Sequence, residues 1–385
     1  MRNWIPKFVL SSYHYFLALT GAFLFSFPSK KITVIGVTGT SGKTTTVEYL
    51  SKILNESGFK TASISSTSFK IGAGEEKNML KMTMPGRFKI QRFLRKAVKE
   101  KCRYAVIEVS SQGIVQFRHK FIRFGVCVFT NLSEEHIESH GGFENYRNAK
   151  LSLFKENPYT HIINREDKYQ DFFWQVPAKN KIEYGLDKRI PFNIKGFNRY
   201  NASAALTAAL YLKIPESVCI RSLEKSKEIA GRVEFVAKEP FSVIVDYAHT
   251  PSQLEELYKM FEGKRKICVL GSCGGGRDKW KRPVMGKIAG KNCEKVIITN
   301  EDPYDEDPEK IIEEVAGLTP AEKILDRRKA IRRALELAMP GDAVIITGKG
   351  SEPLMCVAKG KKIPWDDRAI AREELERIAF YPSVR

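Results

Sequence analysis

A glycine-rich loop near the start of the chain constrains the fold more than any other feature. The loop, GVTGTSGKTTT at residues 36–46, follows the β-branched run ITVIGV and precedes the helix-like segment TTVEYLSKILNESG. Glycines let backbone amides approach phosphates, and the N-terminus of the following helix favours negative charge. The order strand, loop, helix therefore predicts a phosphate site, in which Lys43 reaches the β- and γ-phosphates and Thr44 or Thr45 holds Mg²⁺. A turn that binds nothing is the alternative, and Val37 stands where the strict loop has its first glycine.

Apolar runs alternate with helical patterns along the rest of the chain. The strand candidates are residues 61–65, 104–109, 126–132, 161–164, 241–247, 266–272, 295–300, 321–325 and 343–348. Such alternation implies parallel sheets with helices on their faces. We expect an α/β protein with a P-loop central domain, whose sheet is mainly parallel, and a Rossmann-like C-terminal α/β domain. Hinges near Gly196 and Gly231 place the boundaries, giving segments 1–31, 32–230 and 231–385.

The chain carries a strong positive charge, +19 over 385 residues. Such a charge attracts nucleic acid, anionic lipid or phosphorylated substrates, or simply reflects a lysine-rich solvated surface. Because the sequence has no arginine-rich tract and no basic stripe interleaved with aromatic residues, we expect no nucleic-acid partner. Anionic small molecules or a membrane surface fit the charge better.

The N-terminal segment 8–27 lacks charged side chains and is flanked by basic residues. Its length matches a membrane-spanning helix, but serines, a histidine and tyrosines dilute its hydrophobicity. Three interpretations stay open: a helix in the membrane interface, a true anchor, and a helix packed on the body of the protein. We expect a cytoplasmic monomer, with peripheral association at the inner membrane face as an option.

The seven cysteines show no CxxC spacing, and several lie in apolar strand-like runs such as VCVF and KICVL. Cysteine in such runs behaves as a small hydrophobic residue. The pattern predicts a reduced compartment, with neither a zinc site nor a disulfide framework.

Several polar residues stand where chemistry is plausible. Glu108 ends a buried strand, where an unpaired carboxylate is unfavourable, so a metal ion, a base or a helix cap is its expected partner. His136 follows a later strand and is either a cap or a metal ligand. Asn198 and Asn201 are three residues apart and therefore share a helix face, as nucleotide ligands or caps. Lys150 lies on an amphipathic helix, where lysine is normally solvated.

These motifs, in this order, resemble those of the Mur ligases. The loop GTSGKT resembles the GTxGKT loop of Mur ligases and folylpolyglutamate synthetases, and DYAHTP at 246–251, GRDKWKRP at 276–283 and GKGSE at 348–352 are similar to motifs of the MurE branch. The resemblance extends from about Ile32 to Leu375. It implies an amide-forming, ADP-forming ligase that uses ATP and Mg²⁺ in peptidoglycan precursor synthesis.

The resemblance assigns roles residue by residue. The implied catalytic residues are Lys43, Lys150, His136 and Asp246. The implied ATP ligands are Gly39, Thr40, Ser41, Gly42, Lys43, Thr44, Thr45, Asn198, Asn201, Arg232 and Asp246. The implied Mg²⁺ ligands are Thr44, Glu108, His136 and Lys150, the last as a lysine carbamylated by CO₂. The implied residues for the muramoyl-peptide acceptor are Thr83, Ser110, Gln116 and Arg118. Those for the incoming amino acid are Arg277, Asp302, Tyr304, Gly348 and Glu352.

Two departures from the MurE pattern matter. Only about 30 residues precede the first strand, so we expect the usual uridine-binding N-terminal domain to be missing. Glu301-Asp302-Pro303-Tyr304 replaces the DNPR motif of diaminopimelate-adding enzymes, which removes the arginine partner of a second carboxylate. This favours a diamino acid such as lysine, with diaminopimelate still open.

The expected reaction has two steps: the acceptor carboxylate attacks the γ-phosphate of ATP, and the amino acid then displaces phosphate from the acyl-phosphate. Three alternatives are a folylpolyglutamate or poly-γ-glutamate ligase, a membrane-associated ATP-binding scaffold without ligase activity, and a motor or transport NTPase. The retained motifs favour the ligase over all three.

Overall fold

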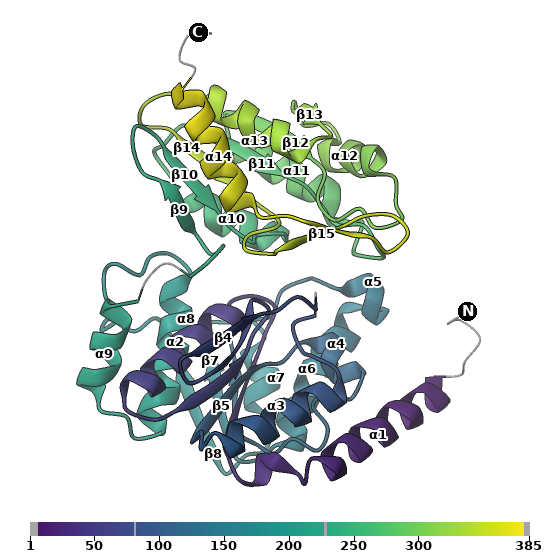
Figure 1. Ribbon diagram of the computed structural model, residues 1–385, viewed down its shortest axis with the longest axis vertical. Helices are drawn as coiled ribbons and strands as arrows, with labels where there is room; N and C mark the ends of the chain where they lie inside the picture. Colours follow the sequence, from purple (N-terminus) through teal and green to yellow (C-terminus); the bar gives the residue numbers. More distant parts are fainter. Residues whose placement is uncertain (1–6, 81, 227–228, 381–385) are drawn as a thin grey trace. The chain divides into compact units, whose positions relative to one another are not determined.

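The computed structural model describes residues 7–80, 82–226 and 229–380, which form two compact units (Figure 1). The first unit contains the chain up to residue 134 and residues 141–226. The second contains residues 135–140 and the chain beyond residue 226. Each unit is built around its own sheet, so the expected α/β fold class is confirmed.

The first unit has an eight-stranded sheet in the order β4-β3-β2-β5-β1-β6-β7-β8. Six strands are parallel, whereas β3 and β4 are antiparallel additions at one edge. The strands are β1 Thr33–Thr38, β2 Thr61–Ile64, β3 Ser68–Ile71, β4 Gly74–Lys77, β5 Tyr104–Glu108, β6 Phe124–Phe129, β7 Thr160–Asn164 and β8 Asn180–Tyr184. The helices are α1 Lys7–Leu24, the short η2 Pro28–Lys30, α2 Lys43–Glu56, α3 Arg87–Lys99, α4 Ser111–Val115, α6 Phe143–Glu156, α7 Gln170–Trp174, α8 Asn198–Tyr211 and α9 Glu216–Glu224.

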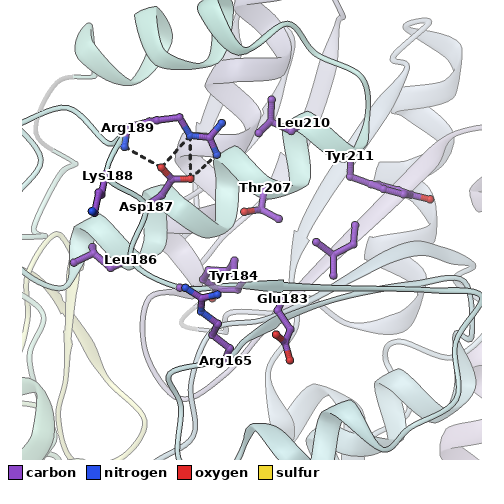
Figure 2. Close-up of a pocket in the computed structure, with 12 residues that line it drawn as sticks. Arg165, Glu183, Tyr184, Leu186, Asp187, Lys188, Arg189, Thr207, Leu210 and Tyr211 are labelled. Atoms are coloured by element: carbon purple, nitrogen blue, oxygen red, sulfur yellow. Dashed lines mark hydrogen bonds and ion pairs between the residues drawn. The ribbon is translucent and has the colours of Figure 1, made fainter.

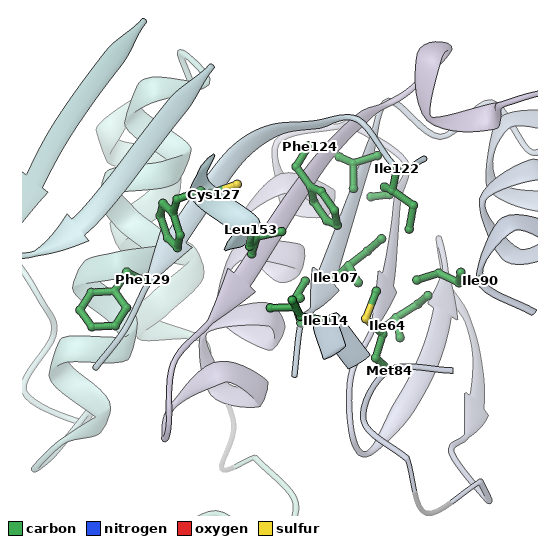
Figure 3. Close-up of a cluster of buried hydrophobic side chains, with 14 of the residues drawn as sticks. Ile64, Met84, Ile90, Ile107, Ile114, Ile122, Phe124, Cys127, Phe129 and Leu153 are labelled. Atoms are coloured by element: carbon green, nitrogen blue, oxygen red, sulfur yellow. The ribbon is translucent and has the colours of Figure 1, made fainter. Parts of the chain in front are cut away.

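The central strands are buried on both faces, which explains their continuous apolar runs. Figure 3 shows part of the resulting core, where Ile107 of β5, Phe124 and Phe129 of β6 and Leu153 of α6 are all fully buried. A Cβ on Gly36 of β1 would lie 2.7 Å from the ring of Phe124, so glycine is required for this ring to cover the strand. The core thereby fixes β1, whose C-terminal end carries the phosphate loop.

The second unit has a six-stranded sheet in the order β13-β12-β11-β14-β10-β9, in which only β9 is antiparallel, and a small two-stranded sheet. The strands are β9 Glu234–Ala237, β10 Ser242–Val245, β11 Lys266–Leu270, β12 Lys295–Thr299, β13 Glu322–Ile324, β14 Ala343–Ile346, β15 Leu354–Cys356 and β16 Lys362–Pro364. The helices are α5 Ile137–His140, α10 Pro251–Lys259, α11 Lys281–Asn292, α12 Pro308–Ala316, α13 Arg327–Glu336 and α14 Asp367–Phe380.

The N-terminal segment forms helix α1, which packs against α3 (Figure 1). Ala18 and Ala22 are buried, and a Cβ on Gly21 would lie 3.6 Å from the backbone of Arg87. Small residues on this face let the two helices approach closely. Within the described residues, no helix combines the length and the hydrophobicity that a membrane span requires.

The expectation of cysteines without disulfides is wrong for one pair. Cys268 of β11 and Cys293, the residue that follows α11, form a disulfide with their Cα atoms 6.1 Å apart. The two residues are 25 positions apart and carry no CxxC signature, so only the tertiary structure brings them together. The other five cysteines are free thiols.

Candidate active site

The phosphate loop joins β1 to α2 in a conformation that only glycine adopts easily. Gly42 has φ +80° and caps α2, and a Cβ there would lie 2.0 Å from Oδ1 of Asn201. Asn201 of α8 therefore lies directly against the loop, and its Nδ2 donates to Oδ1 of Asn198 at 3.1 Å. The structure thus brings the two asparagines expected at the nucleotide to the loop expected to hold its phosphates.

Side chains from neighbouring elements hold the loop in place. Asn131 accepts a hydrogen bond from the backbone nitrogen of Ser41 at 2.9 Å, and the hydroxyl of Thr130 donates to the carbonyl of Ser41 at 2.7 Å. The hydroxyls of Thr40 and Tyr146 lie 3.0 Å apart. The sequence patterns assigned no role to Thr130, Asn131 or Tyr146, although the polar pair Thr130-Asn131 directly follows the apolar residues of β6.

Two lysines converge on one carbonyl of this loop. Lys43 Nζ donates to the carbonyl oxygens of Gly39, at 3.1 Å, and Thr40, at 2.8 Å. Lys150 Nζ donates to the same Gly39 oxygen at 2.7 Å, although it comes from α6. Burial and the charge of Lys43 hold the pKa of Lys150 well below its usual value, and Glu108 only partly opposes this. The Lys150 amine is therefore biased towards its neutral form.

Glu108 lies at the end of β5 and faces the start of α2. Its Oε2 atom accepts hydrogen bonds from the hydroxyl of Thr44 and from the backbone nitrogen of Ser66, each at 2.9 Å. The Ser66 hydroxyl lies 2.7 Å from that of Thr44, and Ser66 is a further residue that the sequence did not reveal. A carboxylate and a hydroxyl that meet beside a phosphate loop are oxygen ligands of the kind that Mg²⁺ prefers, so the residues fit this ion.

His136, which the resemblance assigns to the same metal ion, lies in the second unit, and its role as a ligand stays a prediction. Its backbone has φ +58°, and its segment is held by residues of the GRDKWKRP motif. Asp278 accepts from the backbone nitrogens of Ile137, at 3.1 Å, and Glu138, at 2.9 Å, while Lys281 pairs with Glu135 at 2.8 Å with both side chains buried. Among the described residues, no group of three or more His, Cys, Asp or Glu side chains could hold a metal ion.

The residues expected to bind the acceptor gather at α4. Ser110 caps this helix by accepting from the backbone nitrogen of Gly113 at 3.1 Å. Arg118 donates to Oε1 of Gln116 at 2.7 Å and to the carbonyl of Met84. Met84 packs closely on Gly113 and directly follows Thr83 in the chain. The structure therefore brings polar residues from two loops that are separate in sequence into one cluster, which we call the acceptor cradle.

In the second unit, Asp246 lies at the end of β10 and is almost fully buried. Its carboxylate accepts from the backbone nitrogens of Val233, at 2.7 Å, and Ala248, at 2.6 Å. Burial raises the pKa of Asp246, whereas Arg232 and the two backbone donors oppose the shift. The Arg232 guanidinium lies 4.2 Å from the centre of the Tyr247 ring. Asp246 and Arg232 thus share one corner of this unit, as expected for two residues of one nucleotide site.

Two of the residues expected at the incoming amino acid contact a buried lysine, Lys349, to which the sequence motifs had given no role. Lys349 Nζ donates to Asp302 Oδ1 at 2.7 Å and to Glu352 Oε2 at 2.9 Å. The Tyr247 hydroxyl lies 3.2 Å from the other oxygen of Glu352. A signal was available, because Lys349 stands inside the GKGSE motif. The ammonium of Lys349 is thus shared by two carboxylates of this region.

Three further residues complete this region. Tyr304 has φ +53° and its ring covers Gly275, where a Cβ would lie 2.6 Å from it. Gly348 has φ +106°, and a Cβ there would lie 2.2 Å from Oε2 of Glu301. The Arg277 side chain is exposed, which leaves its guanidinium accessible to a carboxylate. The expected amino-acid residues therefore all lie in the second unit.

A separate cavity of about 630 Å³ lies in the first unit beside β8 and α8 (Figure 2). Figure 2 shows Arg165, Tyr184, Asp187, Arg189 and Thr207 around it. Arg189 is paired with Asp187 at 2.6 Å and with Glu216. No residue assigned from the sequence lines this cavity, so it is distinct from the site described above.

Comparison with known proteins agrees with this geometry. The Mur ligase middle domain matches residues 37–209, and the Mur ligase glutamate ligase domain matches residues 231–350. The chain belongs to the Mur ligase family. It is therefore an ATP-dependent, ADP-forming acid–amino-acid ligase, and Mur ligases of this type use ATP and Mg²⁺.

Relatives within the family cover almost the whole chain. It is 38% identical to the UDP-N-acetylmuramoyl-L-alanyl-D-glutamate–2,6-diaminopimelate ligase of Syntrophomonas wolfei, over 93% of this chain and 81% of that protein. It is 34% identical to the ligase of the same name from Aquifex aeolicus, over 96% and 83%. It is 33% identical to the UDP-N-acetylmuramyl-tripeptide synthetase of a Roseiflexus species, over 94% and 82%.

Solved structures show the same fold. A 2,6-diaminopimelate-adding Mur ligase matches with a TM-score of 0.58 and 27% identity, over 90% of this chain and 79% of that chain. The folylpolyglutamate synthase of Mycobacterium tuberculosis matches with a TM-score of 0.73 but 15% identity, over 87% and 92%. At 15% identity the second match shows the fold alone. The folylpolyglutamate and scaffold alternatives are therefore less supported than a Mur ligase of the MurE branch.

Proposed function

We propose that this Mur ligase joins an amino acid to the terminal carboxylate of a UDP-linked muramoyl-dipeptide, forming the tripeptide precursor of peptidoglycan. One observation carries the proposal. The phosphate loop brings together four polar residues, Lys43, Thr44, Glu108 and Lys150. The chain that holds them is similar, along more than nine-tenths of its length, to ligases with this substrate in their names. The central domain, 32–230, would hold ATP and the acceptor, and the C-terminal domain, 231–385, the amino acid.

The charged residues at the loop have separate tasks in this reaction. When the acceptor carboxylate attacks the γ-phosphate, the bond between the β- and γ-phosphates breaks and ADP leaves. Negative charge develops on the phosphate oxygens, and Lys43 and the backbone amides of the loop stabilise it. Thr44 and Glu108 would hold Mg²⁺, which screens the phosphate charge when bound. The amino group of the second substrate then forms the C–N bond, and inorganic phosphate leaves.

Lys150 is the residue that we propose to be carbamylated. Its neutral amine attacks CO₂, the N–C bond of the carbamate forms, and one proton is released to solvent. Only the uncharged amine is nucleophilic, and burial beside Lys43 favours that form. The product carries an anionic oxygen pair in place of a cation, and this pair would add oxygen ligands beside Glu108. Labelling with ¹³CO₂, followed by ¹³C NMR of native protein and of Lys150→Ala, tests this step directly.

The amino-acid site favours a side chain with a positive charge. Asp302 and Glu352 provide two carboxylates in this region, and Tyr304 replaces the arginine that would attract a second carboxylate. We therefore propose a diamino acid such as lysine, with 2,6-diaminopimelate, the substrate named for the relatives, as the alternative. Arg277 would bind the α-carboxylate with two parallel hydrogen bonds.

We further propose that this enzyme works in the cytoplasm as a monomer, with α1 in contact with the inner membrane surface. The exposed side of α1 carries large apolar side chains, namely Val9, Leu10, Tyr13, Tyr15, Phe16, Leu19, Phe23 and Leu24. The neighbouring helix α3 exposes a row of lysines, Lys89, Lys96 and Lys99. An apolar face beside a basic row suits an anionic lipid surface, whereas a protein of charge +19 repels a second copy of itself.

Vesicle sedimentation tests this association, and chromatography with light scattering tests the monomer. We expect binding to vesicles with phosphatidylglycerol, weaker binding to pure phosphatidylcholine, and loss of binding in Phe16→Ser/Phe23→Ser. Equal sedimentation of native and doubly substituted protein with both vesicles would contradict the proposal. A concentration-dependent dimer that the double substitution abolishes would assign the apolar face to a second copy instead.

Phosphate release tests the reaction itself. Purified protein is incubated with ATP, Mg²⁺ and UDP-muramoyl-dipeptide against a panel of amino acids that includes lysine and 2,6-diaminopimelate. Release that depends on both the acceptor and one amino acid, with a tripeptide product seen by mass spectrometry, confirms the proposal and names the amino acid. ATP binding without acceptor-dependent release for any pairing would contradict it.

A further inference from the structure

Two arginines from different elements meet at the first turn of α3. Arg87 Nη2 donates to the backbone oxygen of Gln116, while Arg118 Nη2 donates to Oε1 of the same residue at 2.7 Å. Arg118 also donates to the carbonyl of Met84, three residues before Arg87. The two guanidinium groups are thus held beside one another by neutral oxygens.

Within the part of the chain that the structure describes, neither guanidinium has a carboxylate partner. The carboxylate of Glu156 contacts the two residues that follow Arg118: His119 at 3.1 Å and Lys120 at 2.8 Å. The Nε atoms of Arg87 and Arg118 are both buried and have no hydrogen-bond partner among the described residues. Each arginine therefore retains a donor that none of these residues satisfies.

The surroundings make this cationic pair unfavourable as it stands. Burial, and then the charge of Arg87, lower the pKa of Arg118, and burial lowers the pKa of Arg87. Helix α3 begins at Arg87 without an acidic residue in its first turn, so its N-terminal amides add further positive potential. Like charges in a partly dry environment repel one another unless an anion lies between them.

The position of the pair indicates which anion it serves. Arg118 and Gln116 end the segment that begins at Ser110, and Met84 follows Thr83, so the pair adjoins the acceptor cradle. On its other side, the backbone of Arg87 lies against Gly21 of α1. The site is therefore continuous with the region where the acceptor is proposed to lie, and it stays within one unit.

We propose that Arg87 and Arg118 together bind an anionic group of the acceptor, and that Arg87 is a specificity-determining residue of this chain. This inference rests on the proposed function. The ligand chemistry is an oxyanion, because a guanidinium presents paired N–H donors that match the oxygens of a carboxylate or a phosphate. In a UDP-linked muramoyl-dipeptide the anion comes from either the peptide carboxylates or the diphosphate.

Equilibrium binding without ATP distinguishes these sources. Three probes are titrated by calorimetry: UDP-muramoyl-dipeptide, muramoyl-dipeptide without the nucleotide, and UDP. The variants are Arg87→Ala, Arg87→Lys and, as a matched control, Arg92→Ala, which removes an exposed arginine from the same helix. We expect Arg87→Ala to weaken binding of UDP-muramoyl-dipeptide by about tenfold or more, Arg87→Lys to recover part of it, and Arg92→Ala to match the native protein.

Each outcome has a definite meaning. If Arg87→Ala weakens the binding of UDP and of UDP-muramoyl-dipeptide, the pair is assigned to the diphosphate. If it weakens the binding of muramoyl-dipeptide with and without UDP, the pair is assigned to a carboxylate. Equal affinities of Arg87→Ala and Arg92→Ala, with native melting temperatures, would overturn the inference, as would a native protein that binds none of the probes. If phosphate release fails with every acceptor while Arg87→Ala still loses probe binding, the anion site stands and the proposed reaction fails.

Discussion

The amine of Lys150 lies 2.7 Å from the carbonyl oxygen of Gly39, which also accepts a hydrogen bond from Lys43 at 3.1 Å. Only 1% of Lys150 is exposed, so its amine is separated from water at the edge of the phosphate loop. Two amines on one carbonyl repel each other if both are protonated. The arrangement therefore couples the charge state of Lys150 to the residue that is expected to contact ATP.

Removing the loop lysine should abolish the reaction. Lys43→Ala is expected to lower acceptor-dependent phosphate release by at least about a thousandfold, because its charge is needed where charge develops on the transferred phosphoryl group. Lys52→Ala, which changes a half-buried lysine on the same helix, serves as the control. Steady-state phosphate release measures both, and comparable rates for the two variants would refute the role of Lys43.

Replacing the buried lysine should be partly reversible by added anions. Lys150→Ala is expected to lose most activity and to regain part of it with short carboxylates such as acetate or propionate, which can occupy the place of the carbamate. The control is Lys155→Ala on the exposed side of the same helix. Unchanged activity in Lys150→Ala, or rescue that is equal for both variants, would contradict the carbamate.

The same lysine should make stability depend on pH in CO₂-free buffer. Its pKa is lowered in the folded state, so the unfolded chain binds more protons at any pH between the folded pKa and about 10.5. The free energy of unfolding therefore rises with pH across that window, by at most about 1.4 kcal/mol per pH unit for this group. Urea unfolding at several values between pH 7 and 9.5 should show that Lys150→Met lacks this increase. If the free energy of unfolding rises equally with pH in the native protein and in Lys150→Met, the lowered pKa of Lys150 is contradicted.

The buried ion pair of Glu135 and Lys281 should matter to the second unit. Lys281→Met leaves a buried carboxylate without its cation, which is expected to destabilise the protein by about 3–5 kcal/mol. The double variant Glu135→Gln/Lys281→Met should recover most of this loss, and Lys287→Met on the same helix should have little effect. Thermal unfolding measures all three, and additive losses in the double variant would show that the two residues act independently.

The charge of the amino-acid site should determine substrate preference. Glu352→Gln is expected to raise the KM for the preferred diamino acid about tenfold, because one of its charge-assisted contacts is lost, while the KM for ATP stays unchanged. Glu309→Gln, an exposed change on α12, is the control. A parallel increase in the KM for ATP would show that Glu352 acts on the fold of the unit and not on the amino acid.

Local patterns predicted much of the fold and part of the site. The loop at 36–46, the strand runs and the ordered motifs are short-range features, and strand, loop and helix preferences act over the same few residues. Because parallel strands end at one edge of a sheet, Glu108 and Thr44 could be expected near the phosphate loop. These predictions depend on nothing beyond the alternation of elements.

Contacts between distant segments could not be predicted in this way. The Cys268–Cys293 disulfide, the contact of Lys349 with Asp302, and the approach of Arg87 and Arg118 at Gln116 each join residues whose sequence neighbours give no sign of the partner. The packing of the His136 segment in the second unit, through Asp278 and Lys281, likewise has no local signal, and the role of His136 at the metal ion stays a prediction.

The sequence by itself determined the class of fold, the phosphate loop and the order of the motifs, because backbone preferences and amphipathic periodicity are local properties. Tertiary structure alone decided the charge states and partners of the buried polar groups. Lys150 shows the reason: on its helix it is an ordinary lysine, and only the packing of α6 against the loop removes water from its amine and sets Lys43 beside it. Desolvation and charge proximity depend on three-dimensional distance, which a local pattern does not contain.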